Sequence, residues 1–207
     1  MKSKFKQFIA FPSLILKKLT SIQQALGRIE TRQNENLNSS DINDYEFKVF
    51  SQWGEDGIIQ YLIKNTEITN QIFVEFGVEN YTESNTRFLL QKNNWKGLVV
   101  DGSDANISYI KNDLIYWKHN IKAECEFITA ENINKILTNN GIRGDIGILS
   151  IDIDGNDYWV WEAIDCISPR IVICEYNSHF GHVHKVSIPY KSDFTREFKH
   201  YSNIYYG

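Results

Sequence analysis

The sequence predicts one α/β domain built on a parallel sheet and preceded by a short amphipathic helix. The chain has 207 residues, of which 42% are hydrophobic, so it can bury the core of one domain. Short apolar runs alternate with longer, helix-compatible stretches, as they do in βαβ units. Several of the apolar runs end in or run into carboxylates. These observations together predict a sheet of about five parallel strands.

The charge is divided unevenly along the chain. Residues 1–40 carry seven Lys or Arg and two Asp or Glu, a formal charge of +5, and the remainder carries fifteen and twenty-four, a charge of −9. An acidic body disfavours nucleic acid as a partner, because neutralising phosphates requires a basic face. A site for a small molecule fits the body better.

The basic N-terminal region predicts an amphipathic helix. Its apolar residues Leu19, Ile22, Leu26 and Ile29 alternate three and four positions apart, which is a coiled-coil spacing. Two heptads are marginally stable alone, so we expect residues 5–30 to associate with a second copy of the chain, with the domain or with a membrane surface.

The domain boundary is expected near residue 44. Residues 31–40 are polar and unpatterned, as in a linker. The predicted organisation is therefore a helix and linker over residues 1–43 and a Rossmann-like domain over residues 44–207.

The cysteines and the N-terminus favour a cytoplasmic protein. Cys125, Cys166 and Cys174 are odd in number, lie in apolar surroundings and form no CxxC pair, so we expect buried, reduced thiols. Lys17 and Lys18 interrupt the N-terminal apolar run before it reaches membrane-spanning length. Any membrane association would therefore be peripheral, through the helix.

The expected elements follow in chain order. Strands are predicted at residues 72–78, 97–101, 125–128, 147–153 and 170–175, and helices at residues 56–64 and 86–92. Ligands of open α/β sheets bind outside the carboxyl ends of the strands. The polar residues at these strand ends should therefore converge on one crevice.

The first two strands end in residues suited to a cofactor. Glu75 and Gly77 close the first strand, and a glycine there allows a ligand to approach the backbone closely. The G-x-G-x-x-G fingerprint of dinucleotide sites is absent from this turn. Asp101, followed by Gly102, closes the second strand, where a carboxylate can accept hydrogen bonds from ribose hydroxyls. An ordinary turn glycine and a solvent-facing aspartate are the structural alternatives.

The densest polar cluster follows the fourth strand and contains Asp152, Asp154, Asn156 and Asp157. An EF-hand loop starting at Asp152 would need Gly at the position of Asp157 and Glu at that of Ala163, so that motif is absent. Mg²⁺ bound by Asp152 and Asp154 stays open, because carboxylates at a strand end are ordinary ligands of hard cations. A loop with Asx-turns is the alternative, and we favour an active-site role.

The fifth strand runs into Glu175 and Asn177, and His179 follows. Histidine titrates near neutral pH, which makes His179 a candidate general base. His182 and His184 also lie nearby, but their spacing and that of the thiols are not typical of a zinc site.

Six segments in this order and spacing resemble one family. They are residues 51–57, 74–77, 101, 130–134, 152–157 and 175–177. The chain is similar, over about residues 48–207, to bacterial methyltransferases related to the FkbM-type enzymes, which are often encoded among surface-polysaccharide genes.

The resemblance implies a class I methyltransferase sheet that binds S-adenosylmethionine across the first two strand ends. By this resemblance the cofactor would contact Gln52, Glu55, Glu75, Gly77, Asp101, Gly102 and Thr129, with Ser51 beside them. Asp152, Asp154 and Asn156 would face the transferable methyl group, and Glu175 and Asn177 would contact the acceptor.

Two departures from the family pattern are visible. Tyr81 stands where the general pattern has a second glycine, which puts close passage of the backbone there in doubt. The antiparallel hairpin that completes a class I sheet is also missing or incomplete after the fifth strand. We therefore expect a shortened sheet with an exposed edge and an impaired activity.

Methyl transfer from a sulfonium is an in-line displacement, so the protein mainly positions the acceptor and removes its proton. The expected reaction is O-methylation of a sugar or a surface-glycan precursor, with His179 or a carboxylate of Asp152, Asp154 or Asp157 as the base. Bound Mg²⁺ would lower the pKa of an acceptor hydroxyl. The alternatives are a metal-dependent phosphoester hydrolase using residues 152–157, and a non-catalytic interaction protein in which the N-terminal helix is the working part.

Overall fold

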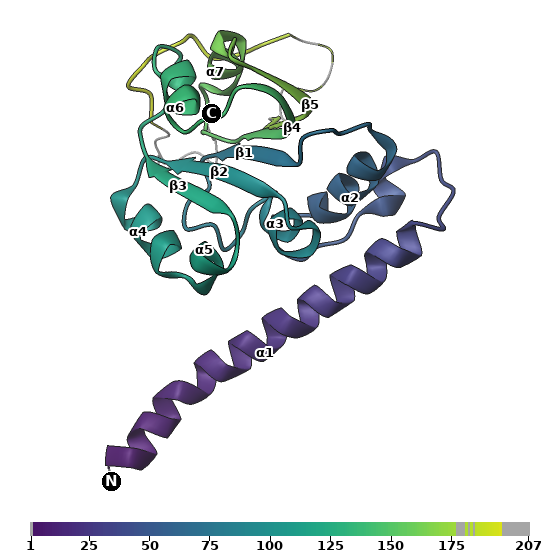
Figure 1. Ribbon diagram of the computed structural model, residues 1–207, viewed down its shortest axis with the longest axis vertical. Coiled ribbons are helices and arrows are strands. Elements are labelled where there is room, and N and C mark those ends of the chain that lie inside the picture. The colour runs from purple at the N-terminus through teal and green to yellow at the C-terminus, as the bar shows by residue number, and fades with distance from the viewer. Residues whose placement is uncertain (1, 177–180, 182, 184, 196–207) are drawn as a thin grey trace.

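A five-stranded parallel sheet forms the centre of the computed structural model, which describes residues 2–176, 181, 183 and 185–195 (Figure 1). The strands are β1 (Ile72–Phe76), β2 (Lys96–Asp101), β3 (Ile121–Cys125), β4 (Gly144–Ile151) and β5 (Ile167–Cys174). Their order across the sheet is β3-β2-β1-β4-β5, and every neighbouring pair is parallel. The predicted α/β class and Rossmann-like sheet are confirmed. Chain order reverses between β1 and β4, which is where open sheets of this kind bind ligands.

Helices cover both faces of the sheet (Figure 1). One face carries α2 (Glu55–Asn65), α3 (Arg87–Asn93), α4 (Asp104–Asn112) and α5 (Leu114–Lys118), and the other carries α6 (Ile133–Asn139) and α7 (Asp157–Ala163). A short 3₁₀ helix, Ile42–Tyr45, precedes α2. The two predicted helices, residues 56–64 and 86–92, correspond to α2 and α3 with ends shifted by one residue.

The core consists of two apolar clusters, one on each side of the sheet. In β1, Phe73 packs with the cluster under α2 to α5, while its neighbour Val74 packs with the cluster under α6 and α7. Both side chains are fully buried. Central parallel strands are covered on both faces, which is why β1 and β4 appear as continuous apolar runs in the sequence.

The third strand was predicted at residues 125–128, and that prediction is wrong. β3 runs from Ile121 to Cys125, and its pairing places Asp101 of β2 beside Cys125. As an edge strand it buries alternate residues, Ile121 and Ala123, between polar ones, so its apolar signal is weak. The apolar residues after Cys125 instead form the loop that leaves the sheet.

The other strands lie where they were expected, with shifted ends. β1 stops at Phe76 because Gly77 turns the chain with a φ of +68°. β4 and β5 each begin three residues earlier than predicted, at Gly144 and Ile167.

The N-terminal helix α1 (Lys2–Asn34) is longer than expected and includes the first residues of the predicted linker. It contacts the domain through a small and polar face: Gly27 and Thr31 are buried, and Gln24 donates a hydrogen bond of 2.7 Å to Gln91. A Cβ on Gly27 would lie 2.3 Å from the Val49 side chain, so a glycine permits this approach.

The apolar seam of α1, defined as Leu19, Ile22, Leu26 and Ile29, faces away from the domain. Its four side chains are 47–56% exposed. Figure 1 shows α1 projecting from the domain. Of the three partners considered for the helix, the domain is contacted by the face with Gly27 and Thr31 and not by the seam. None of the described helices is long and apolar enough to cross a bilayer.

After β5, residues 185–195 pack beside α7 and the loop before it. The Trp159 indole donates a 2.7 Å hydrogen bond to the Ile188 carbonyl, and the Asn156 side chain donates one of 2.8 Å to the Lys191 carbonyl. Among the described residues no strand follows β5, which pairs only with β4.

The three cysteines are free, but the prediction that all are buried is wrong. Cys125 is exposed at the end of the edge strand β3, and Cys166 and Cys174 are partly buried.

Candidate functional site

A cleft of about 720 Å³ opens at the carboxyl ends of β1, β2, β4 and β5. Its volume is in the range of small-molecule sites. The predicted site residues that line it are Gln52, Glu55, Glu75, Gly77, Asp101, Gly102, Asp152, Asp154, Asn156 and Glu175. A second hollow, of about 510 Å³, lies between α1 and α2 and contains no predicted site residue.

Four predicted site residues are not among those that line the cleft. Asp157 and Thr129 are not among the lining residues, although their chain neighbours Asn156 and Ile128 are, so their proposed roles stay predictions. Asn177 and His179 lie outside the described residues.

Gly77 forms the turn after β1, and this turn lies between two halves of the cleft, one at the end of β2 and the other at the ends of β4 and β5. Its N–H donates a 3.0 Å hydrogen bond to the Val100 carbonyl of β2. A Cβ on this residue would lie 1.6 Å from the backbone oxygen of Asp152. No side chain fits there, so the glycine is required by the close approach of β1 to the turn after β4, in addition to its positive φ.

Glu75 lines the cleft, but its carboxylate is used by the neighbouring loop. It accepts hydrogen bonds from the backbone N–H groups of Asn85 and Thr86 and from the hydroxyls of Ser84 and Thr86. Burial raises the pKa of Glu75, and the hydrogen bonds from these donors oppose that shift. Glu75 therefore fixes the loop that forms one wall of the cleft.

Tyr81 adopts the conformation that a glycine would take at this position. Its φ is +63°, and its side chain is fully buried with its hydroxyl 2.9 Å from that of Thr86. The nearby Glu79 also has a positive φ, +46°. Two such residues in one loop are uncommon and cost about 1 kcal/mol or more each. The loop thus follows a glycine-like path although the second glycine is absent.

Asp101 is positioned by backbone donors at the end of β2. Its carboxylate accepts hydrogen bonds of 2.8 Å from the N–H groups of Glu79 and Ser103 and one of 3.0 Å from the Asn106 amide. A carboxylate has about four acceptor positions, so one remains for a ligand hydroxyl. Asp101 is therefore rigid before any ligand binds.

The loop after β3 contributes Phe127 and Ile128 to the cleft, whereas Thr129 begins the turn that leads into α6, whose N-cap is Asn132. The Thr129 N–H donates to the Asn132 side chain at 2.8 Å, and the Asn132 N–H donates to the Thr129 hydroxyl at 3.3 Å. The wrong strand assignment at residues 125–128 misplaced this loop by a few residues.

Asp56 organises the segment that precedes α2. One of its carboxylate oxygens accepts hydrogen bonds from the N–H groups of Val49, Phe50 and Ser51 and from the Ser51 hydroxyl, at 2.6 to 2.9 Å. Ser51 is consequently buried, while Gln52 and Glu55 reach the cleft. In the sequence Asp56 lay in the family-like segment 51–57 and at the start of a predicted helix, and neither feature indicated that it would collect these donors.

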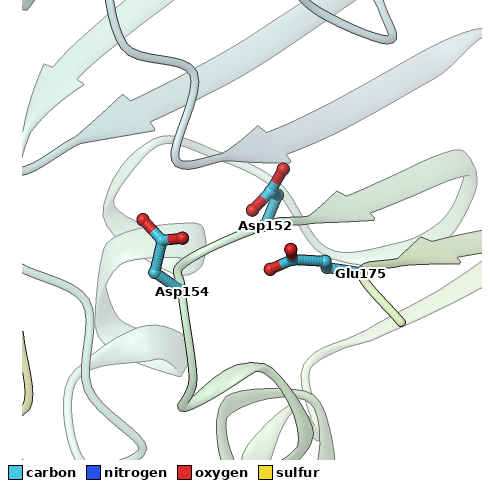
Figure 2. Close-up of side chains that lie close together, drawn as sticks. All are labelled: Asp152, Asp154 and Glu175. Atoms are coloured by element: carbon cyan, nitrogen blue, oxygen red, sulfur yellow. The ribbon is translucent and has the colours of Figure 1, made fainter. Parts of the chain in front are cut away.

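Three carboxylates converge in the half of the cleft at the ends of β4 and β5 (Figure 2). One oxygen from each of Asp152, Asp154 and Glu175 lies within 4.8 Å of the others. The register of β4 and β5 pairs Ile151 with Cys174, which places Asp152 and Glu175 side by side at adjacent strand ends. The structure thus brings together residues that are more than twenty positions apart in the sequence.

Asp157 braces the loop that carries these acids. Its carboxylate accepts hydrogen bonds from the N–H groups of Ile153 at 2.9 Å and Gly155 at 2.8 Å. The loop is tightly folded, with a φ of +58° at Asp154 and +138° at Gly155. These bonds run back to residues 153 and 155, so Asp157 braces the loop without forming an Asx-turn, in which the bond goes to the N–H two residues further on.

The Asp152 side chain is exposed to the cleft, but the protein atoms packed around it remove part of its hydration. This desolvation raises its pKa to about 7, with further contributions from the negative charges of Glu175, Asp157 and Asp154. Several carboxylates lie close together here, so this side of the cleft favours positively charged species.

No family model, curated protein or solved structure matches the chain.

Three exposed aromatic side chains at the cleft were missed by the sequence reasoning. Trp53, Phe127 and Tyr176 are 72%, 48% and 61% exposed and line the opening. Aromatic faces of this kind can stack on a planar or a sugar ring. Their positions in loops carry no periodic signal, so the sequence alone did not distinguish them from core residues.

Proposed function

We propose that the protein is an S-adenosylmethionine-dependent methyltransferase. The observation that supports this most is the arrangement of the cleft: a glycine turn follows β1, beside the point where strand order reverses, and a preorganised Asp101 ends the adjacent strand β2. In this proposal Asp101 accepts a hydrogen bond from a ribose hydroxyl, and Phe127 and Ile128 contact the adenine. The proposal agrees with the family resemblance of residues 48–207.

The acidic half of the cleft then receives the methyl acceptor. A sulfonium is positively charged and already activated as a leaving group, so nearby carboxylates can favour its binding and accept the proton of the acceptor. Asp152 and Asp154 are the bases available among the described residues, and His179 is the other candidate. We propose O-methylation of a sugar or surface-glycan precursor in a reducing cytoplasm, with residues 5–30 serving self-association or peripheral membrane contact.

Cofactor binding tests this proposal. Calorimetry with S-adenosylhomocysteine should show binding to the wild-type protein. The Gly102→Leu variant should lose it, because Gly102 lines the cleft, does not have a positive φ and would place a Cβ at an ordinary 3.5 Å from Phe127. The leucine side chain would then fill the space proposed for the cofactor while the backbone stays unstrained.

Asp104→Leu is the matched control, because Asp104 is an exposed residue in the first turn of α4 and outside the cleft. It should bind S-adenosylhomocysteine like the wild type. If the folded wild-type protein shows no binding, or if Gly102→Leu binds equally well, the proposed cofactor site is wrong.

A metal-dependent phosphoester hydrolase is the second candidate, favoured by the three convergent carboxylates. It predicts cation binding and phosphoesterase turnover without affinity for S-adenosylhomocysteine. A non-catalytic interaction protein, favoured by the exposed seam of α1, predicts neither binding event.

A further inference from the structure

We propose that Asp152, Asp154 and Glu175 form a binding site for one hard divalent cation, with the side-chain oxygen of Asn156 as a fourth protein ligand. The sequence reasoning paired only Asp152 with Asp154, and the fold adds ligands from the end of β5 and from the residue before α7. The role of the cation in catalysis rests on the proposed methyltransferase function, but its binding does not.

The spacing of the three carboxylates fits coordination of a single ion. Their oxygens lie within 4.8 Å of one another. Ligands on opposite sides of one ion are about 4.2 Å apart for Mg²⁺ and about 5 Å apart for Ca²⁺, given their usual bond lengths. Three carboxylates at this separation can therefore share either ion with small side-chain adjustments.

Asn156 supplies an independent observation. Its side chain is only 3% exposed, and its Oδ1 atom has no hydrogen-bonding partner among the described residues, although the residue lines the same cleft as the three carboxylates. Its Nδ2 atom donates to the Lys191 carbonyl at 2.8 Å, which fixes the orientation of the amide. Leaving a buried acceptor unpaired is unfavourable, and amide oxygens are common ligands of hard cations.

The fold holds these ligands in position without a metal. Glu175 is tied to β4 by a 3.1 Å hydrogen bond from its N–H to the Ile151 carbonyl. Asp157 braces the loop between Asp152 and Asn156 through two backbone N–H groups. Because every proposed ligand atom is oxygen, the site should select Mg²⁺, Mn²⁺ or Ca²⁺ over metals that prefer nitrogen or sulfur.

In the methyltransferase proposal, the cation specifies the acceptor. Four protein oxygens leave two positions of an octahedral ion for adjacent oxygens of the acceptor, such as a vicinal diol. Such chelation orients the reacting oxygen and favours its deprotonation. The inferred acceptor class is therefore a sugar with neighbouring free hydroxyls.

Titration with Mn²⁺, followed by the loss of its free-ion electron paramagnetic resonance signal, tests the site without any cofactor or substrate. Wild-type protein should bind one ion, and Asp154→Asn and Glu175→Gln should each weaken binding by about tenfold or more, since ligand charge sets the affinity of such sites. Competition by Mg²⁺ and Ca²⁺ measures the preference among hard cations.

Asp165→Asn is the matched control, because it removes the same charge from an exposed residue just before β5, at the opposite end of that strand from Glu175. The strand between them spans about 25 Å. This control should bind Mn²⁺ like the wild type. No binding to the wild type, or equal affinity in all four proteins, overturns the site. Calorimetry with S-adenosylhomocysteine on the same samples separates the two proposals, because each binding event can fail alone.

Discussion

At the scale of single residues, the main functional positions are explained by close contacts of the backbone. Gly77 was expected to allow a ligand to approach, and the structure adds a stricter requirement, since the Asp152 carbonyl occupies the space of a Cβ. Asp56 and Glu75 each use a buried carboxylate to collect several donors of a neighbouring loop. These residues shape the cleft without having to contact the ligand.

Substitution of Gly77 tests, at the residue scale, whether the close contact with the Asp152 backbone is required. Gly77→Ala should lower the free energy of unfolding by about 3 kcal/mol, because the new methyl group overlaps the Asp152 backbone and the turn must move. Because the turn lines the cleft, the variant should also lose binding of S-adenosylhomocysteine. Urea denaturation and calorimetry measure the two effects.

Gly141 provides the control for backbone conformation. It has a similar φ, +78°, but no atom lies within 4 Å of the position that a Cβ would take. Gly141→Ala should therefore lose only about 1 kcal/mol and keep the cleft intact. Equal losses in the two variants would show that the contact with Asp152 is unimportant.

At the scale of elements, α1 differs most from an ordinary surface helix. Its contact with the domain is made by Gly27 and by the polar side chains of Gln24 and Thr31, whereas its apolar seam faces solvent. An exposed apolar face of this length is typical of an interaction surface. The heptad spacing of the seam favours a second helix as the partner.

Disrupting the seam tests, at the element scale, whether α1 pairs with a second copy of itself. The wild-type protein should have a mass above the 24.2 kDa monomer in light scattering, and Ile22→Asp should reduce it to the monomer because a charge in the seam opposes helix pairing. Ser21→Asp adds the same charge about 100° around the helix and should leave the mass unchanged. A monomeric wild type would contradict self-association, and vesicle flotation would then test peripheral membrane contact.

At the scale of the whole molecule, the sheet order determines both the cleft and the distribution of stability. β1, β2 and β4 have partners on both sides and helices over both faces, whereas β3 and β5 have one described partner each. Amides of central strands usually exchange only when the whole domain unfolds.

Hydrogen exchange followed by mass spectrometry tests this distribution. The slowest amides should belong to β1, β2 and β4, those of β3 and β5 should exchange sooner, and the helical residues before Leu19 should be fastest in a monomer. Ile22→Asp gives the monomer for comparison. Slower exchange in β5 than in β1 would contradict the sheet order as the source of stability.

The sequence alone was sufficient for the α/β class, four of the five strands, the two helices flanking β1 and ten of the residues that line the cleft. Buried central strands and carboxylates at strand ends leave a local pattern, and the carboxyl ends of parallel strands share one edge of a sheet. Only the tertiary structure placed β3, because an edge strand buries alternate residues and loses its apolar run. It also separated Asp157, which braces a loop, from Asp152 and Asp154, and brought Glu175 to them. Those distinctions depend on strand register and on backbone contacts between distant segments, which neighbouring residues in a sequence do not encode.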